Sequence, residues 1–166
     1  MAAPVGIGWK DIDIADPARS SMERNEENME AITVLDADQC WNLLSESVMG
    51  RLALSADGEP EIFPINAYAH NGKILFRTGE GTKLSELAVN SRVAFETDGF
   101  TSKIGWSVVA KGHARILTGT KEIQEADQLP LKPWVPTLKM NYVEIDVTEI
   151  SGRRFAFGPE PDRYPV

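Results

Sequence analysis

The residues best suited to chemistry lie in one short segment, residues 77–83 (RTGEGTK). A strand is expected to end at Arg77 and Thr78, and a helix is expected to begin after the glycines, at Thr82 and Lys83. A helix N-terminus presents unpaired N–H donors and the positive end of the helix dipole. Two cations and two hydroxyls around such a terminus predict a site for a phosphate monoester.

Two nucleotide motifs can be excluded for this segment. The order Gly81-Thr82-Lys83 does not match a Walker A loop, which requires Gly-Lys-Ser/Thr after a longer spacing. Gly79 and Gly81 lack the third glycine of a dinucleotide-binding fingerprint. From the residues alone, a phosphate site and an ordinary capped helix with solvated charges both remain open.

Side chains that could catalyse a reaction by themselves are not recognisable. His70 and His113 have no evident Ser, Cys or carboxylate partner in the sequence, and Cys40 fits best as a small buried residue on a helix. Two histidines and one cysteine also make a metal cluster improbable, so no catalytic residue and no metal ligand is assigned. An anion pocket without a side-chain catalyst is typical of a protein whose chemistry is done by a bound cofactor.

Tryptophans could form walls for a flat ligand. Trp106-Ser107-Val108 begins a long predicted strand, and Trp134 lies in the proline-rich stretch 130–136. An ordinary core or interface role for both tryptophans remains open. A small barrel is not expected to bury Trp106 and Trp134 alone, which favours a second subunit.

Short strands and tight turns dominate the segment that must position these residues. Asp57-Gly58 and Asn71-Gly72 are hairpin signals, and Gly112 predicts a kink or bulge within its strand. Strands are expected at 51–55, 61–69, 73–78, 92–97, 106–117, 140–147 and 152–157, and helices at 36–48, 82–89 and 120–129. The first helix carries a capping box at Asp36 and Gln39, and the second is expected to be capped by Thr82. This pattern predicts a mainly β fold, a small antiparallel six- to seven-stranded barrel with helices outside.

One predicted feature of the first helix concerns its buried face. Cys40, Trp41, Leu44 and Val48 recur at helical spacing. We therefore expect all four side chains on the face that packs against the barrel.

Composition excludes several classes of protein. The 166 residues carry 17 Lys+Arg and 25 Asp+Glu, a net charge of −8, which argues against a basic nucleic-acid-binding domain. No apolar run reaches the length of a membrane span, and residues 1–5 lack the features of a signal peptide, so a cytoplasmic location is expected. Residues 1–30 are acidic and poor in core formers, and are interpreted as a flexible arm before one domain at 31–166.

Several motifs, in this order, resemble a known family. They are Gly50-Arg51-Leu52-Ala53, Pro64-Ile65-Asn66, Ile74-Leu75-Phe76-Arg77-Thr78, Gly81-Thr82-Lys83-Leu84, Asn90-Ser91-Arg92-Val93, Trp106-Ser107-Val108 and Pro133-Trp134. Together they resemble the pyridoxamine 5′-phosphate oxidase-like split β-barrel flavoproteins, especially actinobacterial-type members. The resemblance covers about residues 32–157.

The resemblance implies an oxidoreductase that is a homodimer with FMN at the subunit interface. It implies that Pro64, Ile65 and Asn66 face the isoalloxazine, and that Arg77, Thr78 and Lys83, with Leu84 in the same motif, hold the phosphate. It implies that Trp106, Ser107 and Val108 come from the other subunit, and that Trp134 also belongs to the site. Alternatives are F420 in place of FMN, and a flavin-binding or regulatory module without turnover. Oxidation of pyridoxamine phosphate itself is not expected, since the chain is shorter and lacks the substrate-phosphate residues near its C-terminus.

Overall fold

The structure, a computed structural model, describes residues 31–131, 134 and 137–160. The expected N-terminal arm, residues 1–30, lies outside the described residues. The elements in chain order are β1 (Ile32–Leu35), α2 (Ala37–Glu46), β2 (Met49–Ala56), β3 (Glu59–His70), β4 (Lys73–Thr78), α3 (Thr82–Val89), β5 (Arg92–Phe100), β6 (Ile104–Ile116), α4 (Thr120–Asp127) and β7 (Asn141–Ala156).

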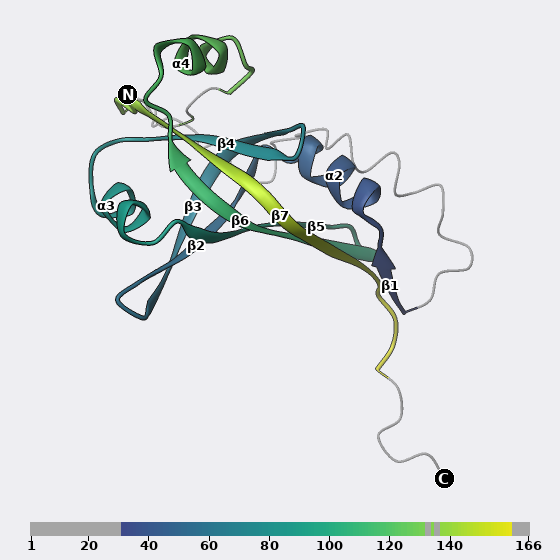
Figure 1. The fold of residues 1–166 in the computed structure, drawn as a ribbon. Helices are drawn as coiled ribbons and strands as arrows, with labels where there is room; N and C mark the ends of the chain where they lie inside the picture. The colour runs from purple at the N-terminus through teal and green to yellow at the C-terminus, as the bar shows by residue number, and fades with distance from the viewer. Residues whose placement is uncertain (1–30, 132–133, 135–136, 161–166) are drawn as a thin grey trace, which may run out of the picture.

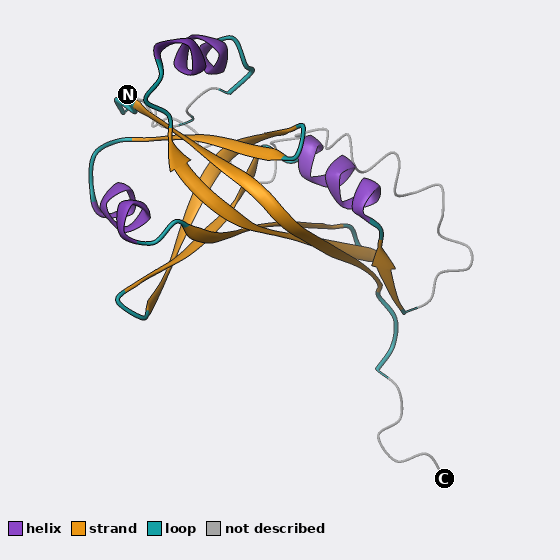
Figure 2. Cartoon of the chain, viewed as in Figure 1, coloured by secondary structure: helices purple, strands orange, loops and turns teal. Residues whose placement is uncertain are grey.

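The described strands form one antiparallel sheet that closes on itself. The strand order is β1-β7-β4-β3-β2-β5-β6, and β6 pairs again with β7. This second pairing closes six strands, β7-β4-β3-β2-β5-β6, into a barrel, and β1 pairs alongside the C-terminal part of β7. The result is the predicted mainly β, split-barrel architecture. Figures 1 and 2 show the described helices α2, α3 and α4 outside the curved sheet.

Both predicted hairpins are confirmed. Asp57 and Gly58 have φ values of 51° and 87°, and Asn71 and Gly72 have values of 50° and 77°. Positive φ at both central residues is the requirement of a type I′ turn, whose twist matches that of the flanking strands. The second hairpin joins β3 to β4 and so fixes the register of the two strands that carry the candidate site.

The C-terminal strand differs from the prediction. The expected strands 140–147 and 152–157 are one continuous strand, β7, of 16 residues. The expected last strand began at Gly152, but Gly152 lies inside β7 and is buried where a Cβ atom would meet Cys40 Sγ at 2.7 Å and Ser107 O at 3.1 Å. Glycine at this position therefore admits the tight packing of α2 and β6 and does not end the strand.

The irregularity predicted at Gly112 is found there, but the bulge is in the neighbouring strand and not in the strand of Gly112. The register of β6 against β7 shifts between Lys111 and Gly112. At Gly112 the main chains of the two strands come so close that a Cβ atom would overlap Asp146 O and would lie 2.9 Å from its carbonyl carbon. Lys111 pairs with Glu149 and Gly112 pairs with Val147, so the extra residue is Thr148. The bulge therefore lies in β7, opposite Gly112, and bends β7 where the barrel closes.

Helix α2 confirms its predicted N-terminus but not its full length. Asp36 and Gln39 form the capping box, with Gln39 N donating to Asp36 Oδ1 at 2.8 Å. Cys40 and Leu44 are buried, but the helix ends at Glu46. The expectation that Val48 lies on the same face is wrong, since it follows the helix and is 59% exposed.

The structure also corrects the expectation for Trp106. This side chain is only 4% exposed and packs in a cluster with Leu35, Cys40, Leu43, Ile104 and Val108. Helix α2 and β1 cover Trp106 within one chain, so burial of this residue needs no second subunit. Trp134, in contrast, is 59% exposed.

Membrane insertion through a helix finds no support in the described part of the chain. None of its helices has the length and apolar character needed to cross a bilayer.

Candidate functional site

The turn between β4 and α3 has an open, donor-rich geometry. Gly81 is the N-cap of α3, with a φ of 144°, and no side chain caps the helix. The expected Thr82 cap is therefore wrong, because Thr82 is already the first helical residue. A Cβ atom at Gly81 would meet nothing within 4 Å. The start of α3 thus has no side-chain cap and has free space at Gly81, two features that suit an anion site at a helix N-terminus.

Among the cationic side chains that the structure describes, Arg77 is the one nearest this turn in the sequence. Its Nε and Nη2 atoms donate to Lys139 O at 3.1 and 2.7 Å, and its Cζ atom lies 5.0 Å from the centre of the Tyr142 ring. Tyr142 Oη donates in turn to Asp127 Oδ1 of α4 at 2.6 Å. Burial, followed by this hydrogen bond, raises the pKa of Tyr142, so the phenol stays protonated and donates. These contacts hold Arg77 in place. A guanidinium has five N–H donors, so further donors remain to bind a ligand.

The other residues of the predicted phosphate motif are divided by the structure. Thr78 is 7% exposed and its hydroxyl donates to Gly79 O at 3.2 Å, so it points to the opposite side of β4 from Arg77. Leu84 is half-buried and packs against the barrel core. The main chain of Lys83 lies in the first turn of α3, beside the open space at Gly81.

The β3 motif alternates between the two faces of the sheet. Ile65 is 7% exposed and belongs to the core, whereas Pro64 is exposed and Asn66 is half-buried on the outer face. Pro64 pairs with Arg51 of β2, and Asn66 pairs with Met49. Among these three residues, only Pro64 and Asn66 can present side chains to a ligand on the outside of the barrel.

The β6 motif shows the same division. Trp106 and Val108 are buried, with exposed fractions of 4% and 0%. Ser107 is half-buried on the outer face, where it pairs with Asp98 and Arg153. Of the three residues 106–108, only Ser107 therefore faces outward. Within one chain, no described contact places Trp106 or Trp134 beside Arg77.

Sequence reasoning missed a cleft of about 400 Å³ beside α4. The cleft lies between α4 and the outer face of β3, β4 and β7. Its lining residues are Tyr68, His70, Asn71, Lys73, Leu75, Arg115, Leu117, Glu122, Glu125, Ala126, Leu129 and Glu144. They come from five separate segments, and only the alternation of β4, with Leu75 opposite Ile74, indicated that an apolar residue faces outward here.

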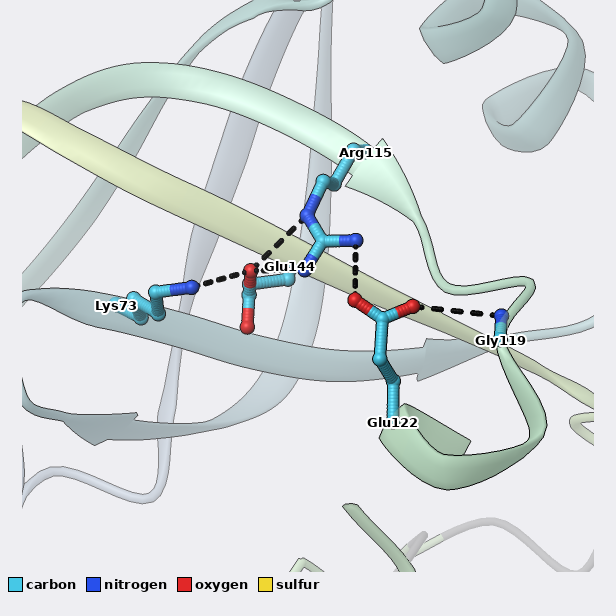
Figure 3. Close-up of polar contacts among 5 residues, drawn as sticks. All are labelled: Lys73, Arg115, Gly119, Glu122 and Glu144. Atoms are coloured by element: carbon cyan, nitrogen blue, oxygen red, sulfur yellow. Dashed lines mark hydrogen bonds and ion pairs between the residues drawn. The ribbon is translucent and has the colours of Figure 1, made fainter. Parts of the chain in front are cut away.

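Ion pairs form one wall of this cleft (Figure 3). Lys73 Nζ and Arg115 Nη2 lie 2.7 and 2.8 Å from Glu144 Oε1, and Arg115 Nη1 lies 2.8 Å from Glu122 Oε1. Glu122 also accepts from Gly119 N at 3.3 Å, which anchors the start of α4. The network thus ties α4 to β4, β6 and β7.

Glu144 is the centre of this network, and its charge should stabilise the fold. Burial alone would raise the pKa of Glu144, but hydrogen bonds from Lys73 and Arg115 outweigh it and lower the pKa. A carboxylate with a lowered folded-state pKa stabilises the protein above its unfolded pKa, and that contribution is lost as the pH falls through the folded value.

We therefore expect Glu144→Gln to lower the free energy of unfolding by about 1–2 kcal/mol at pH 7, near the lower end of the range for hydrogen bonds to a charged group, because Lys73 and Arg115 are partly exposed to solvent. The difference from the unsubstituted protein should shrink towards pH 3, as measured by urea unfolding at both pH values. Glu149→Gln is the control, since the Lys111–Glu149 pair is exposed and should contribute at most about 1 kcal/mol. If Glu144→Gln lowers the free energy of unfolding by the same amount at both pH values, the role assigned to the charge of Glu144 is contradicted.

Comparison with known proteins links this geometry to a family. A family model described as pyridoxamine 5′-phosphate oxidase matches residues 36–154. An uncharacterised protein of Mycobacterium tuberculosis, Rv3129, is 47% identical over 90 residues, which are 54% of this chain and 82% of that protein.

Solved structures support the same relationship. An FAD binding protein from Mycobacterium smegmatis is 40% identical, with a TM-score of 0.66 over 75% of this chain and 99% of the other. A conserved protein of unknown function from Corynebacterium diphtheriae is 44% identical, also with a TM-score of 0.66, over 76% of this chain and 99% of the other.

Proposed function

Because the chain belongs to the pyridoxamine 5′-phosphate oxidase family, we propose that it binds a flavin and acts as a flavin-dependent oxidoreductase. The observation that carries the proposal is the β4–α3 turn, where open space at Gly81 adjoins the N-terminus of α3, which no side chain caps. The name of the M. smegmatis relative, an FAD binding protein, supports a flavin as the ligand. FMN is the proposed cofactor, and it is also the half of FAD that carries the ring and the first phosphate.

The described residues fit a flavin phosphate in two respects. Arg77 is held at the end of β4 by Lys139 O and by the Tyr142 ring, so little side-chain entropy remains to be lost on binding. Gly81 leaves room for phosphate oxygens close to the main chain, and Lys83 would add a second cation. Pro64, Asn66 and Ser107 are the outward-facing residues proposed to contact the ring. A bound flavin would supply the two-electron chemistry, and the chain would bind it, orient it and select the substrate.

The decisive experiment is to identify the chromophore released from the purified protein. We expect a yellow protein whose denatured supernatant has the absorption spectrum and mass of FMN. If the released compound has the mass of FAD, the bound ligand extends beyond the first phosphate. If it has a deazaflavin spectrum, the cofactor is F420 and not FMN. Anaerobic reduction followed by transfer of electrons to an added acceptor would favour an enzyme. A flavin that cannot be reduced would instead favour a binding module, and failure to bind any of these cofactors would contradict the proposal.

We also propose that the protein is a homodimer and that its partner covers the outer face of β2 and β3. Met49 and Ile62 are 48% and 65% exposed on this face, and Pro64 lies beside them. Exposed apolar side chains grouped on a sheet are typical of a subunit interface. The patch includes the β3 motif, so a partner placed here would lie next to the proposed flavin ring.

Sedimentation equilibrium should therefore give about twice the chain mass of 18.3 kDa at micromolar concentration. Ile62→Arg should yield monomers with weakened flavin binding, because it places a charge in an apolar contact. Val89→Arg, at an apolar residue that is 75% exposed at the end of α3, should remain dimeric. A monomeric protein that retains tight flavin binding would contradict a shared site.

A further inference from the structure

The cleft beside α4 combines an apolar floor with an aromatic wall. Leu75, Leu117 and Ala126 are buried, with exposed fractions of 4–7%, and form the floor. Tyr68 and His70 stack above it, with ring centres 5.9 Å apart and planes 26° from parallel. An apolar floor beside a stacked pair of rings favours a flat, unsaturated ligand.

The charges around the cleft disfavour an anionic ligand. Among its described lining residues, Glu122, Glu125 and Glu144 outnumber Lys73 and Arg115. Both cations are engaged, since Lys73 pairs with Glu144 and Arg115 pairs with Glu122 and Glu144. A phosphate ester carries a charge of about −1.5 to −2 and would have to break these pairs. A neutral or positively charged ring would leave them intact.

The cleft adjoins the residues proposed to hold the flavin. Tyr68 follows Asn66 by two residues on β3, and Leu75 precedes Arg77 by two residues on β4. Residues two apart on a strand share one face at a spacing of about 7 Å. Tyr142 also connects the two sites, since its ring contacts Arg77 and its hydroxyl donates a hydrogen bond to Asp127 of α4. A molecule in the cleft would therefore lie beside a flavin that occupies the neighbouring positions.

We infer that the cleft beside α4 binds the organic substrate, and that this substrate is a flat ring that is neutral or cationic and carries no phosphate. The assignment as a substrate site rests on the proposed function. The floor and the Tyr68–His70 wall select the flat ring, and the carboxylate-rich rim selects against phosphate. The ring selectivity and the charge selectivity are thus assigned to different residues, so they can be tested separately.

Two probes that share one ring test this inference: pyridoxamine, whose amine is protonated, and pyridoxamine 5′-phosphate. Both are titrated into the full-length protein at pH 7.5, and binding is followed by isothermal calorimetry and by amide chemical shifts. We expect pyridoxamine to bind at least 10-fold more tightly than its phosphate ester, with the largest shifts at Tyr68, Leu75 and Ala126. Tyr68→Ala should weaken pyridoxamine about 3- to 10-fold through loss of the stacked wall.

Charge variants isolate the role of the rim. Glu125→Gln should narrow the preference for pyridoxamine about 2- to 3-fold, as expected for an exposed charge at the rim. Glu149→Gln removes the same charge from a pair with Lys111 that does not line the cleft, and should leave the preference unchanged. Equal or tighter binding of the phosphate ester, shifts outside the cleft, or no binding of either ring would overturn the inference.

A parallel flavin titration separates this inference from the proposed function. If FMN binds but neither ring does, the cleft assignment fails alone. If pyridoxamine binds in the cleft but no flavin binds, the selectivity of the cleft stands and its assignment as the substrate site of a flavoenzyme is wrong.

Discussion

Alanine in place of Arg77 is expected to weaken FMN binding by roughly 10- to 100-fold and to leave riboflavin binding almost unchanged. A charge-assisted hydrogen bond to a phosphate contributes about 1.5–3 kcal/mol, which gives this range of affinity. Riboflavin has the same ring system without the phosphate, so it measures every other contact. Lys83→Ala should show the same selectivity, because both cations are proposed to hold the phosphate.

The measurement is fluorescence titration of each flavin into apoprotein. Arg92→Ala is a suitable control, since Arg92 is an exposed arginine at the start of β5, beyond the opposite end of α3 from the β4–α3 turn. Because Arg77 also binds Lys139 O, urea unfolding of each variant should accompany the titration. An equal loss of affinity for FMN and riboflavin would mean that Arg77 acts through the fold or the ring and not through the phosphate.

Alanine at Gly112 is expected to cost about 3 kcal/mol of folding stability. The added Cβ atom would overlap Asp146 O and lie 3.0 Å from Val147 Cα, and both are main-chain atoms of β7 that no side-chain rotation can move. Overpacking of this kind typically costs 1–3 kcal/mol, and a clash with main chain belongs at the upper end. Thermal unfolding should show a drop of roughly 10 °C.

Gly158→Ala provides the matched control for this change. A Cβ atom at Gly158 would meet nothing within 4 Å, so the same substitution should alter stability by no more than about 0.5 kcal/mol. A melting temperature for Gly112→Ala within 2 °C of the unsubstituted protein, by the same conversion, would show that β6 and β7 can move apart at the bulge.

Local signals made much of the fold predictable. Asp57-Gly58 and Asn71-Gly72 dictate positive φ at two adjacent residues, and Asp36 with Gln39 satisfies helix donors from within four residues. Such features depend on neighbours in sequence and can be found without the tertiary structure. Gly112 was also recognisable, because a glycine inside a long alternating strand usually marks a bulge.

Features that depend on distant packing were not predictable in the same way. Gly152 was expected to begin a separate strand, since nothing in the sequence reveals that Cys40 and Leu35 pack against it. Trp106 resembled an interface residue because the sequence does not show that α2 covers it.

The candidate site shows the same limit. Residues 77–83 are contiguous, so the phosphate motif could be recognised in the sequence. The ligand that it binds stays a prediction. The cleft is built from β3, β4, β6, α4 and β7, with lining residues from Tyr68 to Glu144. No spacing within one segment could have indicated it.

Strand β7 decides when the barrel can form during synthesis. It pairs with β1, β4 and β6, which all precede it in the chain, and Ile32 is matched to Phe155 across more than a hundred residues. Until β7 emerges, β4 and β6 each keep an open edge that could pair with another nascent chain. Contacts so distant in sequence also slow folding. Premature termination before Asn141 should therefore yield an aggregation-prone product that depends on chaperones, whereas full translation closes both edges in one step.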